Sequence, residues 1–105
     1  MWAVNGNNLT MTEGDWGITL PITVSGVTFT QNDMLKFVFK DQQNGNVILM
    51  KEDTPTNGKI DLVLTEAESA LFPVGTYVYS LDWYQDDAFL CNIITSAALK
   101  VVDKA

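Results

Sequence analysis

The side chains of this sequence that could do chemistry are its carboxylates, its aromatic rings and one thiol. Its 105 residues include thirteen Asp and Glu, no histidine and a single cysteine, Cys91. Cys91 ends the apolar run of residues 89–91, where a thiol usually behaves as a small hydrophobe, and we expect it to be buried and inert. Without histidine or a reactive thiol, the usual pairs of nucleophile and base cannot be assembled. The sequence therefore predicts a protein that is not an enzyme.

The carboxylates raise the question of a metal site. Four of them fall at expected turns, namely Glu13, Asp15, Asp86 and Asp87. Calcium needs carboxylates and carbonyls clustered in one loop, but these residues lack the spacing of a known calcium loop, and acidic residues are ordinary turn formers. Glu66 and Glu68 could in principle act as acid and base, but we expect them to cap and solvate one helical turn. We expect no metal and no cofactor.

The aromatic rings could stack on sugars, which makes a carbohydrate-binding module the alternative function. The rings in question belong to Trp2, Trp16, Tyr77, Tyr79, Trp83 and Tyr84. Four of them are in phase with apolar core positions, which leaves Trp2, Tyr84 and Phe89 as the aromatic residues expected outside. Tyr84 and Phe89 flank the expected turn at residues 85–88, so they predict a small exposed apolar patch at one end of the domain. Such a patch suits a protein partner as readily as a sugar.

Charge and length exclude several classes of protein. Six basic residues against thirteen acidic ones give a net charge of -7, which repels nucleic-acid phosphates and anionic lipid headgroups. The apolar runs are far shorter than the ~20 residues of a membrane helix, and the first residues lack the basic start and apolar stretch of a secretion signal. We therefore expect no nucleic-acid partner, no membrane contact and synthesis in a cytoplasm. With 47% hydrophobic residues, the chain fits one domain over residues 1–105.

The elements that must position these side chains are short β-strands. Alternation of apolar and polar residues between turn formers predicts strands at residues 9–12, 16–24, 34–41, 47–51, 59–64, 76–84 and 91–102. Asn44 and Gly45 predict a hairpin between the third and fourth of these strands. Thr65, three residues before Glu68, has the form of a capping box and predicts a turn or two of helix at residues 65–70. Pro21 lacks an amide hydrogen and so places the second strand at a sheet edge or a bulge.

The alternation also predicts which side chains form the core. Those in phase with the interior are Trp16, Ile18, Leu20, Ile22, Val24, Leu35, Phe37, Phe39, Ile60, Leu62, Leu64, Tyr77, Tyr79, Leu81, Trp83, Ile93, Ala97, Leu99 and Val101. The polar step Thr95-Ser96 in the last strand predicts a bulge. About seven short strands with one short helical turn predict an all-β, immunoglobulin-like antiparallel β-sandwich.

Residues 71–77 resemble the tyrosine corner of immunoglobulin-like domains. They read Leu-Phe-Pro-Val-Gly-Thr-Tyr, and the resemblance implies a structural corner at Gly75 and Tyr77, with the tyrosine ring inside and its hydroxyl against the backbone of residues 71–74. Residues 9–15, which read Leu-Thr-Met-Thr-Glu-Gly-Asp, precede the alternating strand that starts at Trp16. In this combination the chain resembles small phage and prophage β-sandwich proteins. Over nearly its whole length it is similar to the N-terminal domain of phage baseplate upper proteins.

This resemblance implies a structural protein of a virion, in the tail or baseplate, that acts through protein–protein contacts. It implies other virion or tail proteins as partners and allows a homo-oligomer. It also implies residence in the virion, after synthesis in the cytoplasm of a bacterial host. An edge strand and an exposed apolar turn are the surfaces that would meet such partners. The residues expected on those surfaces are Trp2, Pro21, Tyr84, Asp86, Asp87 and Phe89.

Overall fold

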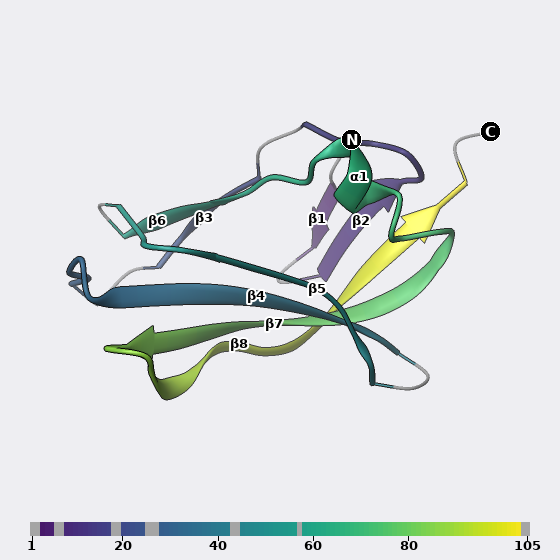
Figure 1. Cartoon of the computed structure of the whole chain (residues 1–105). Helices are drawn as coiled ribbons and strands as arrows, with labels where there is room; N and C mark the ends of the chain where they lie inside the picture. The colour runs from purple at the N-terminus through teal and green to yellow at the C-terminus, as the bar shows by residue number, and fades with distance from the viewer. Residues whose placement is uncertain are drawn as a thin grey trace.

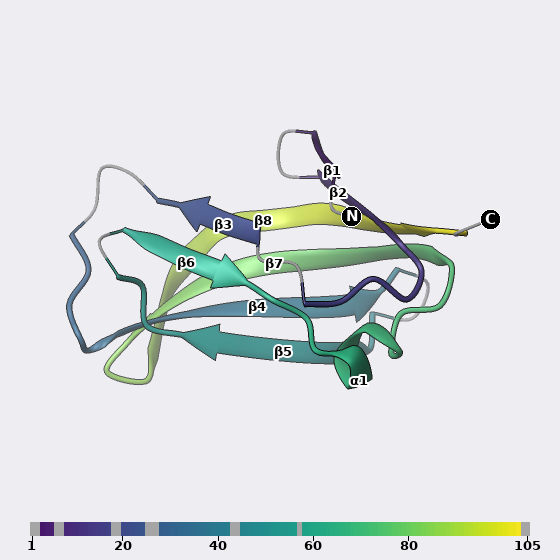
Figure 2. The same ribbon diagram turned by 90° about the horizontal axis from the view of Figure 1, so that it is seen from above.

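Two β-sheets packed face to face make up the protein, as the alternation of apolar residues predicts. The computed structural model describes residues 3–5, 8–17, 20–24, 28–42, 45–56 and 58–103. The larger sheet has the strand order β1-β2-β8-β7-β4-β5, and the smaller sheet pairs β3 with β6. The bounds are β1 (Ala3–Asn5), β2 (Asn8–Thr12), β3 (Leu20–Thr23), β4 (Asp33–Asp41), β5 (Val47–Asp53), β6 (Lys59–Leu62), α1 (Glu66–Ser69), β7 (Gly75–Gln85) and β8 (Ala88–Val102). The fold is therefore an all-β sandwich, with the small sheet lying over one face of the large one (Figure 1 and Figure 2).

One strand pair departs from the expected antiparallel arrangement. β2 runs parallel to β8, with Leu9 opposite Leu99 and Met11 opposite Val101, whereas the other strand pairs of the described residues are antiparallel. Parallel neighbours need a long connection, and here residues 13–87, most of the chain, form it. The large sheet is thus mixed, and the prediction of purely antiparallel sheets is wrong at this pair.

The core lies between the two sheets. Alternate residues of β4 and β7 face it, and Leu35, Phe37 and Phe39 on β4 are all buried. Phe39 has ring centroids of Phe72 and Tyr79 at 5.5 and 5.6 Å, so an aromatic cluster fills the centre. This confirms the register that the sequence predicts for both strands.

The strand predicted at residues 16–24 is shorter in the structure. β3 contains only Leu20–Thr23, and Trp16 is 55% exposed instead of buried. Gly17 has a φ of 74°, and its N–H donates to the carbonyl of Leu64, so the backbone turns before β3 begins and Trp16 loses the phase of the strand. Ile22 and Val24 are partly buried against the core as expected. Ile18 and the side chain of Leu20 lie outside the described part of the structure.

Register shifts in the long hairpin of β7 and β8 change which residues of β8 face inward. Tyr79 lies opposite Ala97 but Leu81 lies opposite Ile94, which places an extra residue at the Thr95-Ser96 step and confirms the predicted bulge. Further shifts follow beside Leu81 and Trp83. As a result Ile94 is buried while Ile93 is only partly so, and Cys91 is exposed, contrary to the expectation of an inert buried thiol.

The two locally encoded motifs form as predicted. At the start of α1, Glu68 N–H donates to Thr65 Oγ1 at 3.2 Å and Thr65 N–H donates to Glu68 Oε1 at 2.9 Å, which is the reciprocal capping box. The Tyr77 hydroxyl donates to the carbonyl of Pro73 at 2.6 Å, and its ring packs edge-on against Phe72. Burial raises the pKa of the Tyr77 hydroxyl, and the nearby charges of Asp41 and Glu13 add to the effect. Gly75 begins β7 directly beneath this corner.

Candidate protein interface

A two-residue turn shapes the end of the β7–β8 hairpin. Gln85 lies opposite Ala88, so the turn consists of Asp86 and Asp87, with φ values of 51° and 66°. Two positive φ angles are the signature of the tight hairpin turn that matches strand twist, and aspartate tolerates them better than most residues. Asp86 N–H donates to the carbonyl of Asn32 at 3.1 Å, which ties the turn to the segment before β4. The hairpin end is therefore held in one place.

Beside this turn lies a surface with exposed apolar side chains, which we call the hairpin patch. It consists of Lys36, Tyr84, Phe89 and Leu90. Tyr84 and Phe89 are cross-strand neighbours whose rings meet edge-on at a centroid distance of 5.6 Å. Phe89 is 52% exposed, and Leu90 next to it is exposed as well. Lys36 Nζ lies 4.0 Å above the Tyr84 ring and 3.4 Å from the Glu52 carboxylate. The rings are thus oriented by their neighbours while remaining accessible.

A buried carboxylate supports the other side of this hairpin end. Asp33 accepts hydrogen bonds from the Thr30 N–H at 2.7 Å and from the Trp83 indole N–H at 2.9 Å. The Trp83 ring packs edge-on against Phe29. The Thr30 N–H and then the Trp83 indole, together outweighing the opposing effect of burial, hold the pKa of Asp33 below its ordinary value. Asp33 therefore fixes the segment before β4 to the strand that carries Tyr84.

The structure brings together some of the residues that the sequence predicted for a partner surface. Asp86, Asp87 and Phe89 are exposed at the hairpin end, and Tyr84 is half-buried there. Pro21 lies on the other sheet, exposed on β3 opposite Asp61. Because Val24 N–H bonds the carbonyl of Gly58 and bonded pairs alternate along an antiparallel ladder, Pro21 occupies a position that needs no amide hydrogen toward β6. Pro21 thus marks a sheet edge, as predicted, but not the same surface.

Two further points from the sequence concern Trp2 and a metal site. Trp2 lies outside the residues that the structure describes. Within those residues, no group of three or more acidic or cysteine side chains is placed to hold a metal ion. Sequence reasoning missed Lys36 and Leu90 as parts of the hairpin patch. Lys36 could have been found from the alternation of β4, whereas Leu90 depends on the irregular register of β8.

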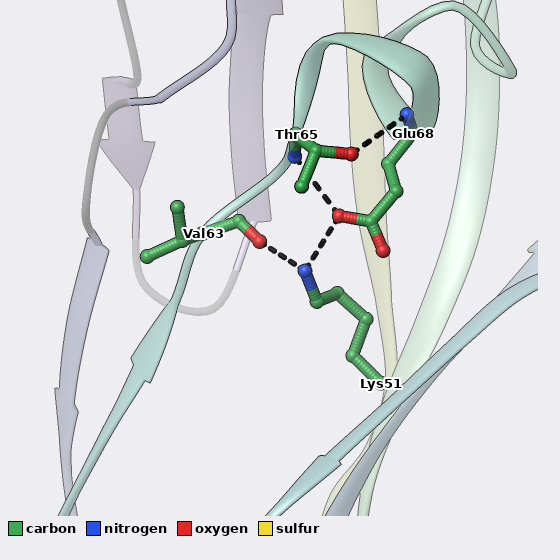
Figure 3. A network of polar contacts seen from close by, with 4 residues as sticks. All are labelled: Lys51, Val63, Thr65 and Glu68. Atoms are coloured by element: carbon green, nitrogen blue, oxygen red, sulfur yellow. Dashed lines mark hydrogen bonds and ion pairs between the residues drawn. The ribbon is translucent and has the colours of Figure 1, made fainter.

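The carboxylate of Glu68 belongs to a network of polar contacts that links β5 to α1 (Figure 3). Lys51 on β5 donates to Glu68 Oε1 at 2.6 Å and also to the carbonyl of Val63. Burial alone would raise the pKa of Glu68, but the hydrogen bonds from Lys51 and Thr65 and the charge of Lys51 lower it below its ordinary value. Lys51 therefore joins the edge of the large sheet to the segment that leads into α1, and Glu66 stays exposed outside this network.

A groove lies between β5 and β6, next to the contact of Lys51 with Val63. Its volume is about 270 Å³, with Phe37 and Leu62 among its apolar lining residues and Asp53 and Asp61 among its acidic ones. Small-molecule sites usually measure about 300–1,000 Å³ and converge several polar groups on the ligand. The Lys51 network occupies the polar groups at one end of this groove.

Comparison with protein-family models, with curated proteins and with solved structures finds no match to this chain. Across the described residues, no helix has the length and apolar character that a membrane span requires. What the hairpin patch does must therefore be inferred from its own chemistry.

Proposed function

We propose that this chain is a structural protein of a bacteriophage or prophage particle, part of its tail or baseplate, and that it works by binding other proteins without catalysis or cofactor. The observation that carries the protein-binding part is the hairpin patch, whose exposed rings sit beside a turn that is tied to the body of the domain. The placement in a phage particle is supported by the resemblance of the sequence motifs to phage baseplate proteins.

The physical case for a protein partner rests on how the hairpin patch is built. Aromatic residues dominate the cores of protein interfaces because they bury a large area while losing few rotatable bonds. Here the edge-on contact of Tyr84 with Phe89 and the position of Lys36 above Tyr84 restrict both rings before binding. Such preorganisation lowers the entropic cost of association. A net charge of -7 disfavours nucleic acid and anionic membranes as alternatives.

The test is a pull-down of the tail proteins encoded beside this chain in its own genome. The wild type should capture at least one of them, and a Tyr84→Asp, Phe89→Asp double variant should lose that capture. A matched control, Val47→Asp with Leu71→Asp, adds the same charge at two other exposed apolar residues and should capture normally. All three proteins must show the same folded circular dichroism spectrum. Wild type that captures no virion protein would refute the phage assignment, and a double variant that captures as much as wild type would refute the patch.

A carbohydrate-binding module remains the second candidate because of Trp16. Its ring is 55% exposed, contrary to the sequence prediction, and exposed tryptophan is suited to stacking on a sugar. Against this, the rings of Tyr84 and Phe89 meet at 71° and do not form a flat platform. A glycan array separates the two candidates: binding that Trp16→Ala abolishes would support the module, and a blank array supports the structural protein.

A further inference from the structure

The outer face of the large sheet carries the hairpin patch at one end, and the proposed function does not use the rest of this face. The small sheet and α1 lie on the opposite side, so no described element covers this face (Figure 1). Strand register places one set of alternate residues on it. Around its centre these are Val38 and Lys40 of β4, Met50 of β5, Val78 and Ser80 of β7, and Ser96, Ala98 and Lys100 of β8.

The charge of this face is opposite to that of the rest of the molecule. Among the described residues, Lys36, Lys40 and Lys100 project from it together with only two carboxylates, those of Glu52 and Asp82. The other two described lysines and eleven carboxylates lie elsewhere. An acidic chain thus carries one face with a net positive charge, which favours an acidic partner.

The centre of the face is slightly hollowed and mixes apolar with polar side chains. A depression of about 130 Å³ is lined by Val38, Lys40, Val78, Tyr79, Ser80 and Ser96. A cavity of about 150 Å³ accepts a molecule as large as benzene, so this depression has room for one small apolar side chain. Met50 lies opposite Val38, which lines this depression, and the Met50 side chain is 54% exposed. We call Val38, Lys40, Met50, Val78 and Lys100 the sheet-face patch.

The chain itself carries a surface of complementary character near α1. We call it the α1 patch: Glu13, Trp16, Glu66 and Val74. The hydrogen bond from Gly17 N–H to Leu64 places Trp16 beside the segment that enters α1. Glu13 N–H donates to the carbonyl of Val102 at 2.8 Å and Gly75 lies opposite Val101, so Glu13 and Val74 lie at the same end of the large sheet, on either side of β8. Trp16, Glu66 and Val74 are exposed, so this patch offers apolar side chains among carboxylates.

We propose that the sheet-face patch of one copy binds the α1 patch of the next, so that the protein associates with itself head to tail. Pairing two sheet-face patches with each other would bring Lys40 and Lys100 of one copy against the same two lysines of the other. This repulsion disfavours a symmetric dimer. A head-to-tail contact closes into a ring or extends as a filament. A standard interface takes about 800 Å² from each partner, which is about an eighth of the 6296 Å² surface of this chain. This self-association goes beyond the proposed function and holds whether or not the chain belongs to a phage.

Sedimentation equilibrium of the whole chain over a concentration series tests the proposal. At about 0.15 M salt the screening length is about 8 Å. The repulsion between the net charges of two copies is therefore weaker than the attraction between charged side chains in direct contact. Wild type should show a mass that rises with concentration. Lys40→Glu should weaken association about tenfold, and so should Glu66→Lys, because each opposes like charges. Lys59→Glu, with the same charge change on β6, is the control and should associate like wild type.

Mixing the variants identifies the geometry. Lys40→Glu mixed with Glu66→Lys should associate more strongly than either alone, since each supplies the charge that the other lacks, and the two substitutions combined in one chain should restore self-association. Wild type that stays monomeric up to millimolar concentration overturns the proposal. Equal weakening by Lys59→Glu overturns the sheet-face patch. Glu66→Lys that associates like wild type, together with a mixture of Lys40→Glu and wild type that associates more strongly than wild type alone, overturns the head-to-tail arrangement in favour of a symmetric one.

Discussion

Lys36 and Lys51 lie on adjacent strands and each forms an ion pair with a glutamate, yet the two pairs face opposite sides of one sheet. Lys51 lies opposite Phe37, points toward the small sheet and reaches Glu68 and the carbonyl of Val63. Lys36 lies opposite Glu52, points outward and rests on the Tyr84 ring. A single step along the strand therefore separates a contact that joins the sheets from one that shapes an exposed surface. The inner face of β4 and β5 builds the core, and the outer face carries the surfaces that we propose for partners.

Truncation of one residue on each face of β4 should show the largest difference. Phe37→Ala removes a buried ring from the core and should cost about 3–5 kcal/mol of unfolding free energy, a large part of the ~5–10 kcal/mol expected for the domain. Val38→Ala, its neighbour on the outer face, should cost about 1 kcal/mol or less. Urea denaturation followed by circular dichroism measures both. Similar losses for the two variants would contradict the division into an inner and an outer face.

Replacement of each lysine should give a smaller difference in the same direction. Lys51→Met leaves the Glu68 carboxylate and the Val63 carbonyl without this donor, and a loss of about 1–2 kcal/mol is expected because both charged side chains are only about a quarter exposed, at 26% and 23%. Lys36→Met should lose at most about 1 kcal/mol, because half of Glu52 is exposed to water, at 50%. Urea midpoints, with Lys59→Met as the baseline, decide the order. A greater loss for Lys36→Met would reverse the roles assigned to the two pairs.

The smallest expected effect is confined to acid pH and concerns the support beneath the hairpin patch. The pKa of Asp33 is lowered from 3.8 in the folded protein, so the unfolded chain takes up the proton more readily. The ionised carboxylate therefore stabilises the fold at all pH values above about 4, and this contribution is lost as the pH falls through the lowered pKa. Urea midpoints measured from pH 7 to pH 2 should fall less steeply below pH 4 in Asp33→Asn than in wild type. Asp61→Asn, at an exposed position, serves as the control, and an unchanged acid slope in Asp33→Asn would exclude this role.

The sequence by itself determined the features that depend on residues close together in the chain. Strict alternation in β4 and β7 set which side chains face the core, because successive residues of a strand point to opposite sides. The capping box of Thr65 and Glu68 and the hydroxyl contact of Tyr77 with Pro73 each span three or four residues, and both formed as predicted. The all-β sandwich follows from the same alternation and from the spacing of the turns.

Only the tertiary structure decided the features that depend on strand pairing over long distances. The parallel contact of β2 with β8, the exposure of Trp16 before the turn at Gly17, and the exposure of Cys91 all depend on which backbone groups find each other across the sandwich. A bulge shifts the face of each residue beyond it, so a period of two read from the sequence fails wherever an extra residue enters a strand. Alternation in β4 places Lys36 on the outer face, but only the pairing of β4 with β7 brings it above the Tyr84 ring, so its part in the hairpin patch depends on the tertiary structure.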